Sequence, residues 1–270
     1  MTRLTPLAVA ALALAVAIPA GMAAGAATPP VAVSVSPPVL FLQGATTTTL
    51  AVTNPSSQPT TILVRTGNYN VAADGGVRID PKLPPARSAK AWLRVSPRSL
   101  TLGPGQRGTV TVVAAPPRVA APGDHHALVL LAGTGGRAAV AIRAQVGVNV
   151  IVRVSGPLVR SLRVTAPRVR RVKRRRVIAV PIANRGNVVE RLLRKQVTVE
   201  LRRGRKLAAR VAAASTIVLP GTAVTLRVPV PRRLKGRYRA VVVVRPAKRV
   251  AEGPGVRALK VIRKARAVRL

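Results

Sequence analysis

The chain has 270 residues, of which 46 are Lys or Arg and 6 are Asp or Glu, so its formal net charge is +40. Hydrophobic residues make up 48%, which excludes a disordered basic tail and is enough for a folded core. The absence of Cys excludes a disulfide scaffold, a thiolate zinc site, an iron–sulfur cluster and a lipid-modified N-terminal Cys. The length predicts one large or two modest domains.

Residues 1–27 have the pattern of a secretory signal peptide. Arg3 gives a positive start, the stretch from Leu7 to Ile18 is apolar, and Ala24-Gly25-Ala26 fits a small-x-small cleavage site. A membrane anchor is the alternative, but the apolar stretch is shorter than the roughly 20 residues of a spanning helix and lacks a basic flank. We therefore expect an exported chain that begins near residues 28–31 and is extracellular, periplasmic or associated with the cell wall.

The rest of the chain alternates apolar and polar residues in the way that is typical of β-strands. Many short runs with a period of two, separated by Pro, Gly, Asn and Ser, indicate an all-β sandwich or barrel. Asn54 is expected to close a turn, as is Gly103–Gly108, which matches a dinucleotide-binding glycine pattern but precedes a strand instead of a helix. In the first half, the expected strands lie at 31–35, 50–53, 62–64, 93–95, 110–114 and 127–132.

The second half repeats this alternation. Turns are expected at Asn184 and at Arg203-Gly204. Residues 207–214 have some helical propensity, but the β-branched residues that follow favour an extended segment. The other expected strands lie at 178–182, 197–201, 224–230, 236–245 and 256–262.

A domain boundary is expected near Ser155-Gly156-Pro157, which gives two β-sandwich domains over residues 28–155 and 156–270. The charge density changes at the same place. Residues 28–150 carry 11 Lys and Arg against 3 acidic residues, a net charge of +8, whereas residues 151–270 carry 34 against 3, a net charge of +31. The second domain, with its basic C-terminal tail, should therefore attract anions.

Several segments resemble a known family. A PapD-like immunoglobulin-type domain is suggested by the first half, at Val33–Pro37, Leu50–Ser56, Val95–Pro97 and Leu102–Gln106. This sequence also resembles the WxL-interacting proteins, which are bacterial cell-surface proteins with domain of unknown function 916. The similarity to these proteins lies at Ala115-Pro116, Pro122-Gly123 and Ala127–Ala132. The second half is similar to their second domain at Val180–Asn187, Leu219–Gly221 and Lys235–Tyr238. The resemblance implies two tandem immunoglobulin-like β-sandwich domains after a signal peptide, and a role in binding peptidoglycan or partner surface proteins. The family usually ends in a transmembrane helix, for which this sequence has no apolar span.

The densest basic run is the candidate contact site for an anionic cell-envelope polymer. We expect it to lie in a connection ahead of the strand at 178–182. The alternative is a solvated face enlarged by compositional bias, but that bias does not explain why so few acids compensate the charge. Nucleic acid is disfavoured as a partner because of the export signal and the scarcity of aromatic residues for base stacking. The seven residues are Arg168, Arg170, Arg171, Lys173, Arg174, Arg175 and Arg176.

Other conspicuous residues have structural interpretations. Adjacent His125 and His126 should point to opposite faces of an extended segment, so they are poorly placed to share a metal ion. Tyr238 is expected to fasten a loop as a tyrosine corner, and Trp92 to fill the core. With six acidic residues and no nucleophile or metal-binding motif, we expect no catalytic site, no metal and no cofactor.

Three functions of different classes remain open. The leading hypothesis is a secreted or cell-surface protein that binds peptidoglycan, anionic wall polymers or other surface proteins without catalysis. The first alternative is a pilus-chaperone-like protein that binds subunits by strand addition, in which case a partner should co-purify. The second alternative is a basic nucleic-acid-binding protein, which requires residence in the cytoplasm.

Overall fold

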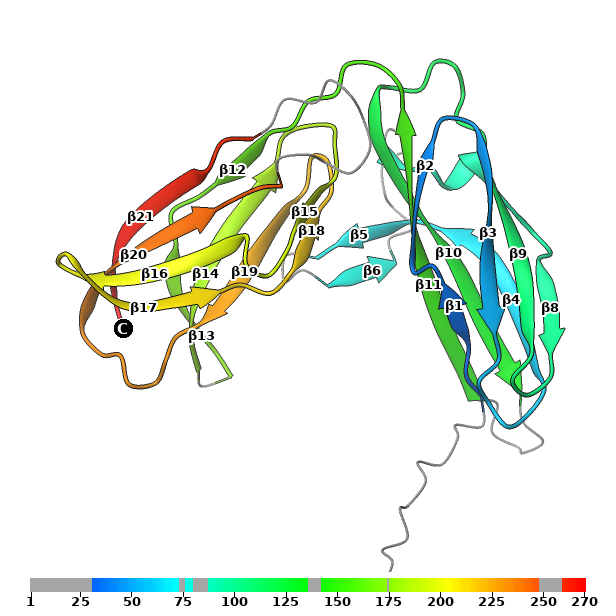
Figure 1. The fold of residues 1–270 in the computed structure, drawn as a ribbon, viewed down its shortest axis with the longest axis horizontal. Helices are drawn as coiled ribbons and strands as arrows, with labels where there is room; N and C mark the ends of the chain where they lie inside the picture. Colours follow the sequence, from blue (N-terminus) through cyan, green and yellow to red (C-terminus); the bar gives the residue numbers. More distant parts are fainter. Residues whose placement is uncertain (1–30, 73–75, 80–86, 136–141, 174, 248–258) are drawn as a thin grey trace, which may run out of the picture.

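The computed structural model describes residues 31–72, 76–79, 87–135, 142–173, 175–247 and 259–270. The expected signal peptide, residues 1–27, lies outside them. The described residues form two groups of β-sheets, one for each half of the chain (Figure 1). The expectation of an all-β fold is confirmed.

The first domain is a sandwich of two sheets with the strand orders β1–β3–β9–β7 and β2–β11–β10–β4–β8. Alternate residues of each strand, such as Leu50 and Val52 on β3, are fully buried between the sheets, as a period of two requires. The elements are β1 (Ser34–Ser36), β2 (Val39–Gln43), β3 (Thr46–Thr53), β4 (Thr60–Gly67), β5 (Tyr69–Val71), β6 (Val77–Ile79), the 3-10 turn η2 (Lys90–Trp92), β7 (Leu93–Ser96), β8 (Ser99–Leu102), β9 (Arg107–Ala114), β10 (Gly123–Gly135) and β11 (Ile142–Val154).

The second domain is a smaller sandwich. One sheet centres on β14, which pairs with β12, β13 and β19, and the other has the order β17–β16–β20–β21. The strands β15 and β18 pair with each other. The elements are β12 (Leu162–Val164), β13 (Arg168–Val172), β14 (Arg175–Asn184), β15 (Glu190–Leu192), β16 (Val197–Arg203), β17 (Lys206–Ala212), β18 (Thr216–Val218), β19 (Ala223–Pro229), β20 (Arg237–Val244) and β21 (Ile262–Arg269).

The chain crosses between the sheets of the first domain near its start. Strand β1 pairs antiparallel with β3, and after Pro37-Pro38 the chain continues as β2, which pairs parallel with β11. Strand β2 covers only the stretch of β11 from Asn149 to Arg153. Most of the N-terminal half of β11 therefore has β10 as its only strand partner among the described residues.

A buried Asn closes an equivalent turn in each domain, as expected. The amides of Asn54 and Asn184 each donate to the carbonyl four residues later and to a carbonyl on another strand. Their backbone carbonyls accept from Gly105 and Gly221, the glycines of the two Pro-Gly turns. The likeness between the halves is thus built from the same hydrogen bonds.

The end of the chain differs from the expectation. Of the last strand expected at 256–262, residues 259–261 are not in a strand. The expected basic tail instead forms β21, which pairs antiparallel with β20, from Arg269 opposite Arg237 to Ile262 opposite Val244. Strand β20 is strongly apolar and needs a neighbour to satisfy its backbone, and Val268 covers Tyr238. Pairing of the backbone therefore prevails over the charge of the tail. Residues 256–258 lie outside the described residues.

The apolar core of the second domain continues onto the first. Tyr69 and Val71 of the β5–β6 hairpin, and Leu128 and Leu130 of β10, belong to the same cluster of buried residues as the second-domain core. Figure 1 shows this hairpin reaching from the first sandwich toward β15 and β18. The hairpin and the outer face of β10 thus lie where the two domains meet.

Candidate functional site

The predicted basic run lies on a β-hairpin and not in a connection. The expectation is wrong because Val169 packs against the core, and the segment pairs residue by residue with the start of β14. Lys173 forms the turn with a φ of 44°. Arg168, Arg170 and Arg171 lie on β13, Arg175 and Arg176 begin β14, and Arg174 lies outside the described residues.

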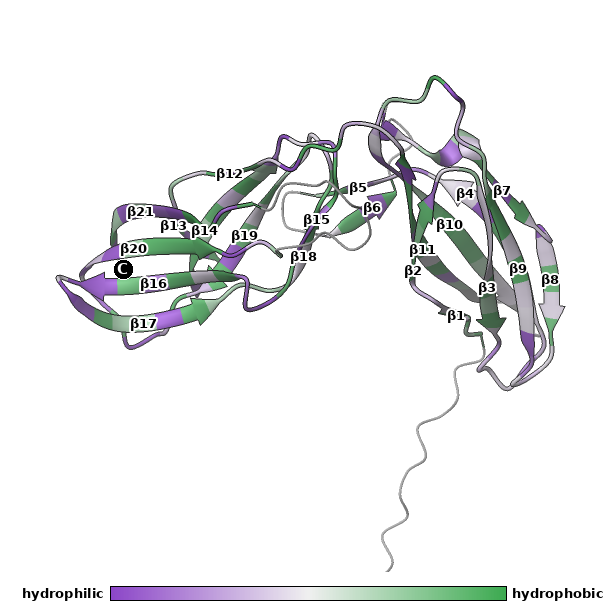
Figure 2. Cartoon of the chain, turned by 45° about the horizontal axis from the view of Figure 1, so that its top comes forward, coloured by the Kyte–Doolittle hydropathy of each residue, from purple (hydrophilic) through white to green (hydrophobic). Residues whose placement is uncertain are grey.

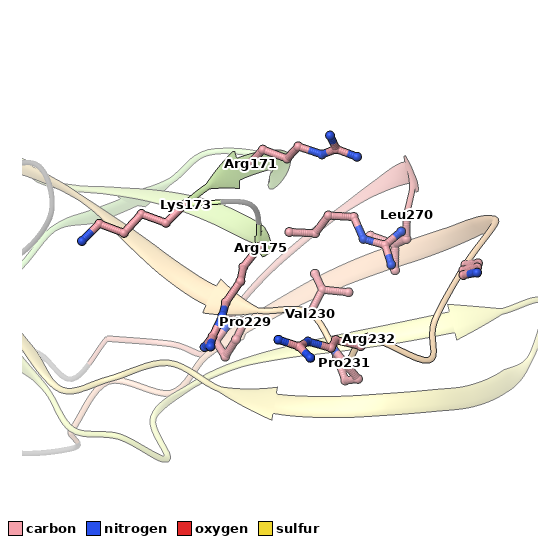
Figure 3. A pocket seen from close by; sticks show the side chains of 10 residues that line it. Arg171, Lys173, Arg175, Pro229, Val230, Pro231, Arg232 and Leu270 are labelled. Carbon is pink, nitrogen blue, oxygen red and sulfur yellow. The ribbon is translucent and has the colours of Figure 1, made fainter.

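Part of this run lines a hollow of about 970 Å³ at one end of the second domain (Figure 3). The structure adds two cations that the sequence prediction missed, Arg232 and Lys235, from the segment between β19 and β20. They come close because Pro229, at the end of β19, pairs with Val177 of β14. Arg168 and Arg170 are not among the lining residues. We call this site the basic hollow: Arg171, Lys173, Arg175, Arg176, Arg232 and Lys235.

No Asp or Glu side chain lines the basic hollow among the described residues. The described acidic residues of the second domain are engaged elsewhere. Glu190 pairs with the buried Arg160 at 2.7 Å, and Glu200 pairs with Arg202 and Arg210, each at 2.8 Å. The hydrogen bonds from Arg202, followed by those from Arg210, lower the pKa of Glu200. Apart from the carboxylate of Leu270, the last residue of the sequence, no acidic group of the described residues neutralises the cations of the hollow.

A second candidate site is the open edge of β11. The backbone N–H of Asn149 donates to the carbonyl of Pro38, which places the N–H and C=O of Asn149 on the edge that β2 covers. Because backbone groups alternate along a strand, Gln145 and Gly147 present theirs to the same edge, beyond the reach of β2. Both residues are exposed. The edge of residues 142–148 can therefore accept another strand.

A groove of about 490 Å³ runs beside this edge. Its floor includes Leu128 and Leu130 of β10, which face Asn149 and Gly147 across the pair, and its wall is formed by Val77 and Ile79 of β6. Those two wall side chains are 50% and 54% exposed. The groove is thus apolar in its floor and wall, whereas β11 contributes Gln145, Gly147 and Asn149.

Hydrogen bonds that are buried at Asp124 and exposed at Asn187 hold the two domains together at the start of β10. The carboxylate of Asp124 accepts from Arg153 at 2.7 and 3.0 Å and from the backbone N–H of Val189, in the second domain, at 2.7 Å. The amide of Asn187 donates to the carbonyls of Pro122 and Pro157 at 3.1 and 2.9 Å. These contacts fix how the second domain sits against the start of β10.

The two histidines point to opposite faces, as expected. His125 packs against Trp92, with ring centroids 4.5 Å apart, and His126 meets the ring of Tyr69 edge-on at 5.0 Å. Burial lowers the pKa of His126 to about 4 and raises the pKa of Tyr69. No group of His, Asp or Glu within the described part of the chain could hold a metal ion.

The hydroxyl of Tyr238 has a different partner from that of a tyrosine corner. It accepts from the guanidinium of Arg203 at 3.1 Å, and Arg203 also donates to the carbonyl of Lys235. The ring of Tyr238 lies under the same guanidinium, 4.9 Å from its centre. Tyr238 thus fastens the loop through Arg203 and not through the backbone.

The fold is shared with pilus chaperones. The class 5 fimbriae chaperone CfaA is 13% identical, with a TM-score of 0.51, and the match covers 86% of this chain and 99% of that chain. A chain of a chaperone–tip adhesin complex of CFA/I fimbriae is 12% identical, with a TM-score of 0.49 and coverage of 87% and 98%. The chain matches no protein-family model and no curated protein sequence.

The likeness to CfaA shows the class of fold: two immunoglobulin-like domains arranged as in a PapD-like chaperone. The expectation of this two-domain fold is confirmed. In the described residues, no helix is long and apolar enough to cross a membrane.

Proposed function

We propose that this chain binds an extended segment of a partner protein as an added strand at the open edge of β11. The proposal rests on one observation, the edge of residues 142–148, which has a strand partner on one side only among the described residues and lies beside an apolar groove. The likeness of the fold to chaperones supports it. In strand addition the main chain supplies affinity and pockets for alternate side chains supply specificity.

The side chains on β11 indicate that the bound segment, and not β11 itself, supplies the apolar side chains. Ala144, Val146 and Val148 face the core of the first domain, whereas the outer face carries Gln145 and Gly147. The strand itself therefore offers no apolar row to the partner. Apolar side chains at alternate positions of the bound segment would fill the groove instead. The net charge of +40 favours a segment with acidic flanks.

A proline at Gly147 tests the proposal. The N–H of Gly147 faces the open edge and not β10, so Gly147→Pro removes a donor for the added strand while the existing ladder stays intact. Gly147→Ala is the matched control, because a Cβ there lies 3.5 Å from Leu128, an ordinary contact, and the N–H remains.

The measurement uses peptides selected for binding to the full chain from a displayed library at high salt. We expect Gly147→Pro to weaken a selected peptide at least about tenfold, as the loss of a main-chain hydrogen bond and a steric block at the edge imply, and Gly147→Ala to leave its affinity nearly unchanged. Equal affinities for the two variants would contradict strand addition. A melting curve of each variant shows that it is folded.

Export, the domain boundary near residues 155–157 and the relationship to WxL-interacting proteins remain part of this proposal. They rest on the signal-peptide pattern, on the change of charge density and on the sequence motifs respectively. Binding of peptidoglycan or a surface protein also remains a prediction. A surface protein that carries the bound segment would satisfy both this prediction and strand addition.

A further inference from the structure

We infer that the basic hollow binds the phosphate groups of a flexible anionic polymer. This inference goes beyond strand addition, because it concerns the second domain and uses none of the residues of β11. It follows from three properties of the hollow: the convergence of cations from two segments, the chemistry of those cations, and the character of the other lining residues that the structure describes.

The first property is convergence. Figure 3 shows side chains entering the hollow both from the β13–β14 hairpin, as Arg175 does, and from the segment after β19, as Arg232 does. Arg176 is held in place because its guanidinium donates to the carbonyl of Leu234 at 2.9 Å. The hollow is thus a concave surface with cations from two parts of the chain, and not a linear run of charge.

The second property is the chemistry of the cations. Four of the six are Arg, whose planar guanidinium binds phosphate oxygens through two parallel hydrogen bonds. The second half of the chain carries a net charge of +31, so neighbouring cations repel one another unless an anion neutralises them. Figure 2 shows hydrophilic residues on β21, and these include the exposed Arg263, Lys264, Arg266 and Arg269. A polymer that leaves the hollow would therefore meet further positive charge.

The third property distinguishes between classes of polyanion. Its apolar lining residues are Pro229, Val230, Pro231 and Leu270, and none of them is among the exposed large apolar side chains of the described residues, so the hollow offers little apolar surface to a lipid bilayer. No aromatic residue lines it either, so bases of a single-stranded nucleic acid have nothing on which to stack. A chain of phosphodiesters or phosphoanhydrides with neither lipid nor bases fits these properties best.

The test uses the full chain and long-chain inorganic polyphosphate as the probe, with affinity measured over a range of salt concentrations. The variant Arg171→Gln/Arg175→Gln/Arg232→Gln removes three exposed cations of the hollow. The matched control is Arg163→Gln/Arg185→Gln/Arg194→Gln, which removes three exposed cations of the same domain, none of which lines the hollow. Both variants change the net charge by the same amount.

We expect the hollow variant to lose at least about tenfold in affinity at physiological salt, and its logarithmic salt slope to become shallower by about 2, since each lost phosphate contact contributes roughly 0.7. The control variant should lose much less. Equal losses in the two variants, or no binding of polyphosphate, would overturn the inference.

Two further arms identify the ligand. Polyglutamate of similar charge should bind more weakly than polyphosphate, because carboxylates replace phosphates, and equal binding would refute phosphate recognition. Vesicles that contain phosphatidylglycerol, and single-stranded DNA, should bind the wild-type chain more weakly than polyphosphate at the same phosphate concentration, because no aromatic residue lines the hollow to stack on bases and it offers little apolar surface to a bilayer. Binding of either one that depends on the hollow and is as tight as that of polyphosphate would overturn the choice of polymer. Peptide binding at β11 should be the same in all variants, so strand addition is tested separately.

Discussion

At the scale of single residues, the polar groups inside the first domain are of two kinds. Asp124 is fully satisfied, since Arg153 and the N–H of Val189 both donate to its carboxylate. The ring nitrogens of His126 and the hydroxyl of Tyr69 are buried without a hydrogen-bond partner among the described residues. The hydrogen bonds of Asp124 fix the geometry between the domains, and the buried imidazole of His126 makes the free energy of unfolding depend on pH.

The pKa of His126 leads to the first prediction at this scale. Burial, with smaller contributions from the charges of His125 and Arg87, lowers this pKa from 6.5 to about 4, although a backbone interaction with Tyr69 acts in the opposite direction. Between pH 6.5 and about pH 4, the unfolded chain therefore binds a proton at His126 that the folded chain does not bind. The free energy of unfolding should fall as the pH drops from 7 toward 4, by up to about 3 kcal/mol from this residue.

Urea unfolding at a series of pH values measures the effect. His126→Leu should remove this part of the pH dependence, because the leucine cannot be protonated. Tyr69→Phe should keep it, since burial raises the pKa of Tyr69 and the phenol stays neutral throughout. A wild-type slope that His126→Leu leaves unchanged would refute the assignment to His126.

At the scale of elements, alternation in the sequence predicts most strands but not all. The strands at Leu50, Val110 and Val224 were predictable because apolar and polar residues alternate cleanly there. The β13–β14 hairpin and β21 were not, because long Arg side chains hide the period of two. Alternation also predicts on which face of a sheet a residue lies, but it does not predict which strands are neighbours. The approach of Arg232 to the hairpin could therefore not be predicted.

The turn of the β13–β14 hairpin gives the prediction at this scale. Lys173 has a φ of 44°, in the left-handed region where a side chain costs about 1 kcal/mol and Gly costs little. Lys173→Gly should therefore raise the free energy of unfolding by up to about 1 kcal/mol, and Lys173→Ala should not. Urea unfolding of the two variants decides between them. A gain of equal size in both would point to relief of charge repulsion instead of relief of backbone strain.

At the scale of the whole molecule, the two candidate sites divide the chain between two tasks. The first domain carries an open strand edge and an apolar groove, and the second carries the basic hollow and most of the charge. The buried carboxylate of Asp124 and the amide of Asn187 hold the second domain against the start of β10. The sequence alone indicates the division of charge, whereas the open edge emerges only from the pairing of β2 with one end of β11.

The most direct test of strand addition is amide hydrogen exchange, residue by residue, on the full chain with and without a selected peptide. In the free protein, Ala144 and Val146 should exchange slowly because their N–H groups face β10, and Gln145 and Gly147 should exchange quickly because theirs face the open edge. Peptide binding should slow Gln145 and Gly147 and leave Ala144 and Val146 as they were. Protection that appears elsewhere while these two amides continue to exchange quickly would contradict the account.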